Sequence, residues 1–379
     1  MEYKKLGDIA TYINGYAFKP EQRGSEGLPI IRIQDLTGNA YDLGYYNGDY
    51  PNKIELNDGD VLISWSASLG VYLWNRGKAL LNQHIFKVVF DKVEIDKFYF
   101  MYAVEYNLDK MSLKTHGATM KHITKKDFDN VVIPYPDLDY QKEISYRLTS
   151  LKGIIKKYQK QLDLLDELIK ARFVEMFGDP VTNDMLWNTD VLKDICTKIG
   201  SGSTPRGGKE SYIDEGISLI RSMNVHNAYF EYKDLAHITL DQAEKLNNVV
   251  VEHDDLLFNI TGASVARCCV VPSDVLPARV NQHVCILRCR EKINPIFLQG
   301  LLVNENYQGK LLQIAKSGAT REAINKQQLE SLEIMIPTLE LQNQFASFVE
   351  EIDKSRSRIQ KSLEASQELF DSLMQEYFG

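Results

Sequence analysis

The chain has 379 residues, of which 44% are apolar and 25% charged, a composition typical of a globular protein and a length sufficient for two domains with separate hydrophobic cores. Its 52 acidic and 44 basic residues give a net charge of −8, which argues against a protein that coats nucleic acid by bulk electrostatics. No run of 18 apolar residues and no charged-then-apolar leader is found, so we expect no membrane span, no signal peptide and a cytoplasmic location.

Residues 1–139 are predicted to form a domain dominated by short strands. Runs rich in β-branched and aromatic residues are separated by Gly, Asn, Asp and Ser, and a short helix is expected near 96–110. The predicted strands are PIIRI (29–33), DVLISW (60–65), HIFKVVF (84–90) and VVIPYP (131–136).

Residues 140–180 are predicted to form one long helix. From Ile144 onward apolar residues recur with alternating spacings of four and three, and Leu148, Ile155 and Leu162 lie on this stripe. Pro136 stands just before the helix, where a proline does not break helical hydrogen bonds. The spacing indicates a helix of coiled-coil type.

The second half repeats this order. Strands are predicted at 217–222, 255–260, 283–289 and 333–337, and short helices near 293–315. These make a second domain at 181–340, and a second long helix at 341–379 carries the stripe residues Val349, Leu363 and Phe370. The expected fold class is therefore α+β, with two sheet-containing domains separated by two long helices.

The two halves are copies of one module. When residues 117–178 are shifted by 201 positions onto 318–379, 17 of the 62 pairs are identical and no gap is needed. Two copies related by a pseudo-twofold axis present matching stripes, so we expect the long helices to pair as an antiparallel coiled coil that spaces the domains. The alternative is that each stripe packs only on its own domain.

All five cysteines lie in the second half: Cys196, Cys268, Cys269, Cys285 and Cys289. They show neither CxxC pairs nor the spacing of a zinc site, so we interpret them as reduced core residues and expect no metal.

Motifs that occur twice in the same order carry a family resemblance. They are the LxDIxTxI openings at 6–13 and 192–199, the NQH segments at 82–84 and 281–283, the GATxxxI segments at 117–123 and 318–324, and the IPYPDLDYQ and IMIPTLELQ runs at 133–141 and 334–342. In this order the chain resembles the specificity subunit of Type I restriction-modification systems. In the second copy Met335 replaces Pro134 of the first, which affects only a strand end.

The resemblance implies a non-catalytic adaptor. Each globular domain would be a target-recognition domain that reads one half of a bipartite, asymmetric site in double-stranded DNA, and the helices would set the spacing and dock two adenine-methyltransferase subunits. The chain itself would need no cofactor. S-adenosylmethionine would be used by the modification subunits, and ATP and Mg²⁺ by the restriction (translocase) subunits.

DNA contacts are expected from basic and polar loops, because phosphate contacts fix the register and base-edge contacts specify the sequence. One basic patch surrounds each GAT segment, for which a solvated charge run is the alternative. Its residues are Lys114, His116, Lys121, His122 and Lys125 in the first copy, and Lys316, Arg321 and Lys326 in the second. The loop 200–209 adds Ser203, Thr204, Arg206 and Lys209, a set suited to phosphate.

Two further groups follow matching strands. Arg32, Gln34, Arg221 and Asn224 are of the types that read guanine or adenine, although an internal salt bridge is the alternative for the arginines. Trp65 and Thr261 lie on matching turns. The NQH side chains are interpreted as structural hydrogen-bonding groups.

Two other functions stay open. The net charge of −8 favours a two-headed scaffold that binds proteins and not DNA. A self-contained DNA methyltransferase is the other alternative, but the sequence has no NPPY-like motif and no glycine-rich cofactor loop.

Overall fold

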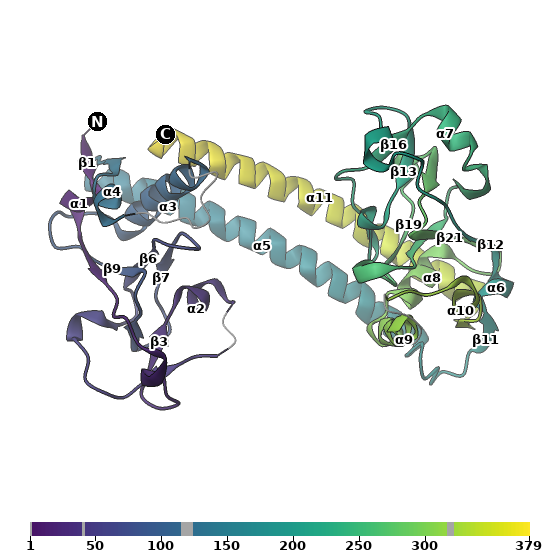
Figure 1. Ribbon diagram of the computed structural model, residues 1–379, viewed down its shortest axis with the longest axis horizontal. Coiled ribbons are helices and arrows are strands. Elements are labelled where there is room, and N and C mark those ends of the chain that lie inside the picture. Colours follow the sequence, from purple (N-terminus) through teal and green to yellow (C-terminus); the bar gives the residue numbers. More distant parts are fainter. Residues whose placement is uncertain (1, 40–41, 115–123, 317–321) are drawn as a thin grey trace. The chain divides into compact units, whose positions relative to one another are not determined.

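The computed structural model describes residues 2–39, 42–114, 124–316 and 322–379, with side chains except at 111–114. The chain forms two compact units, each of which combines residues from both halves of the sequence. Unit 1 contains Met1–Gln159 and Lys361–Gly379, and unit 2 contains Lys160–Gln360 (Figure 1).

Unit 1 contains ten strands and four short or medium α-helices before the first long helix, counted over its described residues. The strands are β1 (Tyr3–Lys5), β2 (Thr11–Asn14), β3 (Leu28–Ile31), β4 (Tyr45–Tyr46), β5 (Glu55–Leu56), β6 (Val61–Ser64), β7 (Gly70–Leu73), β8 (Ala79–Leu81), β9 (Ile85–Val89) and β10 (Val132–Pro134). The helices are α1 (Leu6–Ile9), α2 (Ile33–Thr37), α3 (Lys97–Lys114) and α4 (Lys125–Asp129), followed by α5 (Leu138–Phe177).

These strands form two four-stranded sheets and one two-stranded ladder. One sheet has the order β2-β9-β6-β7, the other the order β4-β3-β8-β5, and β1 pairs with β10. All pairs are antiparallel except β3 with β8, which is parallel.

Unit 2 repeats this plan. Its strands are β11 (Asn188–Val191), β12 (Cys196–Ser201), β13 (Ile217–Ile220), β14 (Val225–His226), β15 (Tyr229–Phe230), β16 (Ala236–Ile238), β17 (Val250–Val251), β18 (Leu256–Asn259), β19 (Cys268–Val270), β20 (Ala278–Val280), β21 (Val284–Cys289) and β22 (Glu333–Ile336). Its helices are α6 (Leu192–Ile195), α7 (Leu240–Glu244), α8 (Pro295–Leu302), α9 (Glu305–Lys316) and α10 (Lys326–Glu330), followed by α11 (Leu339–Phe378).

The sheets of unit 2 match those of unit 1 strand for strand. Their orders are β12-β21-β18-β19 and β16-β13-β20-β17, with β11 paired to β22 and with β13 parallel to β20. The hairpin β14-β15 is an addition, since none of the described strands of unit 1 corresponds to it. The predicted strands, the short helices and the α+β class are confirmed, and the duplication is therefore a duplication of structure.

The two long helices run antiparallel where they meet. In unit 2, Asp166 of α5 accepts a hydrogen bond from Arg356 of α11, and further along α5 the ring of Phe173 lies against that of Phe345 of α11. As the residue number rises along α5, the number of its partner on α11 falls. Of the predicted stripe residues, Leu148, Ile155 and Val349 are buried, whereas the last three of the set are half-buried: Leu162, Leu363 and Phe370.

Each long helix ends in the core of the opposite half. Phe173 and Phe177 at the end of α5 pack against Phe297 and Phe345 of unit 2, with ring centroids 4.8–5.9 Å apart. At the end of α11, Phe378 packs against Tyr99 of unit 1 with centroids 5.2 Å apart. The repeated FG endings therefore close the other unit's core, so neither half of the sequence builds a complete unit alone.

A repeated glutamine fixes the start of each long helix. Gln141 is buried; its side-chain oxygen accepts a hydrogen bond from the N–H of Asp96 (2.9 Å), and its nitrogen donates to the carbonyl of Pro136 (2.7 Å). Gln342 makes the equivalent bonds to Asn294 (2.8 Å) and Pro337 (2.9 Å). The glutamine of the IPxPxLxxQ run thus ties the long helix to the helix that packs beside it.

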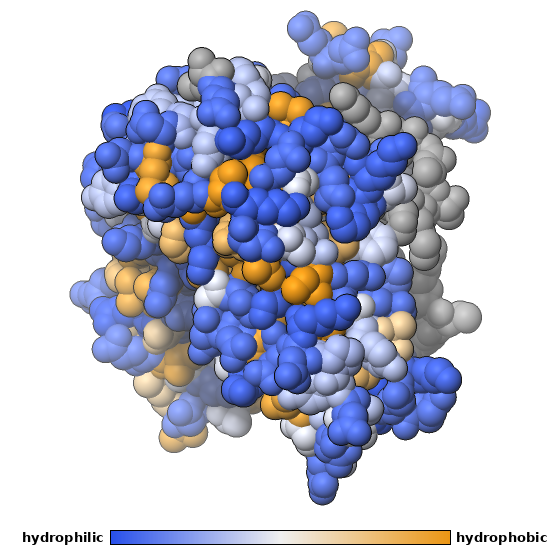
Figure 2. Space-filling model, turned by 90° about the vertical axis from the view of Figure 1, so that its left-hand side faces the viewer, coloured by the Kyte–Doolittle hydropathy of each residue, from blue (hydrophilic) through white to orange (hydrophobic). Residues whose placement is uncertain are grey.

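The surface seen from the side of unit 1 is mainly hydrophilic, with hydrophobic residues scattered in small groups (Figure 2). Among the described residues, no helix is both long and apolar enough to cross a membrane.

Replacing the aromatic side chain at one helix end should destabilise the unit that it closes. We expect Phe378→Ala to lower the free energy of unfolding of unit 1 by about 3–5 kcal/mol, because the phenyl ring leaves a cavity in a packed core. Leu369→Ala on the same helix is the control: Leu369 is 52% exposed, so its loss should change stability by no more than about 0.5 kcal/mol. The measurement is denaturant unfolding of the three proteins, and equal losses for both variants would contradict the role of Phe378.

Candidate nucleic-acid interface

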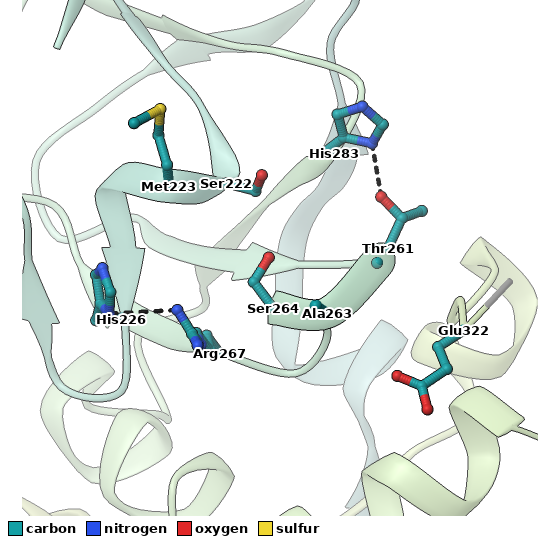
Figure 3. Close-up of a pocket in the computed structure, with 10 residues that line it drawn as sticks. Ser222, Met223, His226, Thr261, Ala263, Ser264, Arg267, His283 and Glu322 are labelled. Atoms are coloured by element: carbon teal, nitrogen blue, oxygen red, sulfur yellow. Dashed lines mark hydrogen bonds between the residues drawn. The ribbon is translucent and has the colours of Figure 1, made fainter. Parts of the chain in front are cut away.

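Each unit has a cavity at the ends of its strands. In unit 2 a cavity of about 820 Å³ opens between the turn after β13, the β18-β19 loop and the turn before β21 (Figure 3). It is lined by Ser222, Met223, His226, Thr261, Gly262, Ala263, Ser264, Arg267, His283 and Glu322.

The cavity of unit 1 has a volume of about 580 Å³. It is lined by Arg23, Arg32, Ile33, Gln34, Thr37, Asn39, Ser66, Ala67, Ser68, Asn82, Gln83 and His84. Most of these residues come from α2 and the residues at its two ends, from the β6-β7 loop and from the turn before β9, and Arg23 comes from the loop before β3.

The two cavities occupy equivalent places in the repeat. The N–H of Trp65 donates to the carbonyl of His84 (3.3 Å), and that of Ile260 to the carbonyl of His283 (3.0 Å). A second equivalent hydrogen bond starts at the asparagine of each NQH segment. The N–H of Asn82 donates to the carbonyl of Ile31 at the end of β3, and that of Asn281 to the carbonyl of Ile220 at the end of β13, at 3.1 Å in both units. The backbone frame is therefore shared, whereas most of the lining side chains differ.

The NQH segment of unit 2 connects the cavity to the loop at 202–209. His283 Nδ1 is hydrogen-bonded to the hydroxyl of Thr261 (2.6 Å), and its Nε2 to the side-chain nitrogen of Gln282 (3.1 Å). The Gln282 oxygen accepts from the hydroxyl of Thr204. In unit 1, Asn82 Oδ1 and His84 Nδ1 are buried and have no hydrogen-bond partner in the described structure. The two frames thus differ in how their polar groups are used.

The arginines that follow β3 and β13 are held internally. Arg32 binds both carboxylate oxygens of Asp35 (3.0 and 3.4 Å), which raises the pKa of the guanidinium. Arg221 donates to the carbonyl of Asp234 and lies over the ring of Tyr212 at 5.4 Å. The structure therefore has Arg32 in the internal salt bridge that the sequence left open as an alternative.

Their predicted companions take different places. Gln34 is exposed and lines the first cavity, and Met223 lines the second at the equivalent position. Asn224 is fully buried and donates to the carbonyls of Glu231 (2.9 Å) and Lys233 (3.3 Å), so in this conformation it presents no surface to a base.

Of the two residues on matching turns, Thr261 lines its cavity. Trp65 is half-buried, stacks on Phe86 (centroids 5.5 Å, planes 22° apart) and meets the edge of His84. Ser66, beside it, is the residue that lines the first cavity.

The described candidates from the loop 200–209 and from the two basic patches are exposed or half-buried. Ser203, Arg206 and Lys209 are exposed, and Thr204 is half-buried. Lys125 and Lys326 are exposed but form ion pairs with Asp129 (2.6 Å) and Glu330 (3.6 Å) within their own helices, and Lys316 is exposed at the end of α9. The side chain of Lys114 and the residues His116, Lys121, His122 and Arg321 lie outside the described residues.

Several lining residues carry no signal in the sequence of one half alone. They include Met223, His226, Ser264, Arg267 and Glu322 in unit 2, and Arg23, Asn39 and Ser68 in unit 1. A comparison of the two copies could have found them, because residues that differ between the copies next to motifs that both copies share are candidates for reading different targets. Among the described residues, no group of three or more His, Cys, Asp or Glu could hold a metal ion.

A family model described as "Type I restriction modification DNA specificity domain" matches residues 1–164 and again residues 185–367. The chain belongs to this family. The match falls once on each copy of the module, so the repeat read from the sequence is a repeat of the specificity domain.

Individual relatives agree along almost the whole chain. The chain is 24% identical over 390 residues to the Type I restriction enzyme EcoBI specificity subunit of Escherichia coli, covering 94% of this chain and 80% of the relative. Its fold is similar to the crystal structure of a Type-I restriction-modification S subunit from M. genitalium, with a TM-score of 0.62, 14% identity and coverage of 100% and 96%. A structure from work on complex assembly and conformational transition of the type I R-M system gives a TM-score of 0.58, 16% identity and coverage of 99% and 97%.

Removing two positive charges from the loop at 202–209 should weaken DNA binding by a specificity domain. We expect Arg206→Ala combined with Lys209→Ala to lower the slope of log affinity against log salt by up to about two, because each lost phosphate contact leaves about one counterion unreleased. The measurement is a salt titration of DNA binding. Lys193→Ala with Lys245→Ala, which removes two exposed charges elsewhere in unit 2, is the control, and identical curves for both double variants would exclude this loop from the interface.

Proposed function

We propose that this chain is the DNA-recognition subunit of a Type I restriction-modification complex and that it reads a target of two different halves, one with each unit. The observation that supports this proposal is the pair of cavities, which share a backbone frame but differ in their lining. Two cavities with identical linings would read a symmetric site. Gln34 and Met223 occupy one equivalent position, and a polar and an apolar side chain there would contact different bases.

The remaining functions would belong to partner proteins. Two methyltransferase subunits would dock on the chain and use S-adenosylmethionine, and restriction subunits would use ATP and Mg²⁺. With a net charge of −8, the chain has little bulk attraction for DNA, so the partners would share in binding the phosphate backbone. The chain itself would carry no catalytic residue.

Mapping of genome methylation in cells that carry the complete system tests the two-part target. We expect a motif of two unlike half-sites separated by an unread spacer, since each unit contacts one half-site. A palindromic motif would contradict the assignment of different half-sites to the two units.

The net charge of −8 also favours an alternative function, that of a scaffold that binds only proteins. A gel-shift assay of the chain together with its methyltransferase partner separates the two functions. Absence of any shift at low salt would favour the scaffold.

The long helices are proposed to set the length of the spacer. Inserting one heptad into both α5 and α11, near Lys156 and Arg358, adds about 10 Å of helix at about 1.5 Å per residue and keeps the apolar stripes in phase. We expect each half-site to stay the same and the spacer to lengthen by about three base pairs, at about 3.4 Å each. An unchanged spacer with normal methylation would show that the partner subunits set the distance.

A further inference from the structure

We infer that Arg267 is a specificity-determining residue that reads a guanine in the half-site of unit 2. This inference rests on the proposed function, because it assumes that the cavity of unit 2 faces the edges of the bases. Arg267 was not among the residues singled out in the sequence, and it lines the cavity of unit 2 beside Ser264 (Figure 3).

The guanidinium of Arg267 is oriented but not neutralised. Its Nη1 is hydrogen-bonded to His226 Nδ1 at 3.3 Å, and the His226 ring stacks on Tyr229 with centroids 4.6 Å apart and planes at 14°. Within the described part of the chain, Arg267 forms no ion pair and no other side-chain hydrogen bond. A guanidinium has five N–H groups, so most of its donors are available to a ligand.

Within the described ranges of the chain, only unit 2 has this arginine and this histidine at the cavity. Just beyond the β18-β19 pair, the N–H of Asn259 donates to the carbonyl of Arg267 (2.8 Å). In unit 1 the residue that faces Ser64, at the equivalent end of β6, is Gly70. The loop that leads to this position has seven residues in unit 2 (260–266) and five in unit 1 (65–69).

His226, which orients Arg267, also lies in a segment that unit 2 has in addition to the plan shared by the two units. His226 is the last residue of β14, in the hairpin that has no counterpart among the described strands of unit 1. In unit 2, Arg221 binds the carbonyl of Asp234, 13 residues further along the chain. In unit 1, Arg32 binds the carbonyl of Asp42, which is only 10 residues further along, so the segment that contains the hairpin is three residues longer in unit 2. Where two copies of a module must read different sequences, side chains added to one copy at the reading site are the candidates for specificity.

The chemistry of the cavity favours a base edge over a phosphate. Glu322 lines the other side of the same cavity (Figure 3), and its carboxylate would repel a phosphate group. The edge of guanine is uncharged and presents O6 and N7 side by side in the major groove, where two parallel N–H groups of an arginine bind them. Arg267 supplies that fork, and His226 limits its rotation.

The test is methylation mapping in cells that carry the complete system with Arg267→Ala or Arg267→Gln. With alanine, we expect one guanine of one half-site to become degenerate while the other half-site stays unchanged. With glutamine, whose amide pairs with adenine N6 and N7, we expect the preference at that position to move toward adenine. In competition binding with the purified complex, the wild type should discriminate at this position by about 5- to 150-fold, and the alanine variant should lose this factor.

Arg290→Ala, which removes an exposed arginine of unit 2 outside the cavity, should leave the motif unchanged. An unchanged motif in both Arg267 variants would overturn the inference, and uniformly weaker methylation of that motif would assign Arg267 to a phosphate. Either result leaves the proposed function standing. If the wild type itself yields no two-part motif, the proposed function fails, independently of Arg267.

Discussion

The structure depends on the burial of each long helix's end in the core of the opposite half. Phe177 joins the aromatic cluster of unit 2, and Phe378 joins that of unit 1. Full burial of one such side chain contributes about 1.5–3 kcal/mol, a large share of the stability of an ordinary domain. Because each helix also begins at a buried glutamine of its own half, both ends of each helix are fixed by buried side chains.

The repeat separates what is held constant from what varies. The glutamine at each helix start, the NQH backbone bonds and the strand orders recur in both copies, and all of them are buried or made by the backbone. The differences gather at the cavities, where a loop is lengthened and a hairpin is added. A module of this kind can change the sequence that it reads without disturbing its core, because loop insertions cost little stability compared with core substitutions.

Much of the fold could be predicted from the sequence, because strand runs and the four-and-three stripe are local patterns, and the repeat allowed each copy to check the other. The exchange of helix ends could not, since periodicity does not tell which core a phenylalanine enters. The same limit applies to the site. Asp35 lies only three residues from Arg32, so their pairing was open to prediction, but the place of Arg267 depends on strand register and on a loop whose length alone does not reveal where it points.

The exchange of helix ends also fixes an order in time. A ribosome that makes this chain completes residues 160–360, which form the whole of unit 2, before it adds the segment 361–379 that closes unit 1. At about 5–20 residues per second, the first unit waits about 10–40 seconds after its residue 159 is made for the helix end that covers Tyr99. Unit 1, most of which is synthesised first, is therefore the unit that finishes folding last.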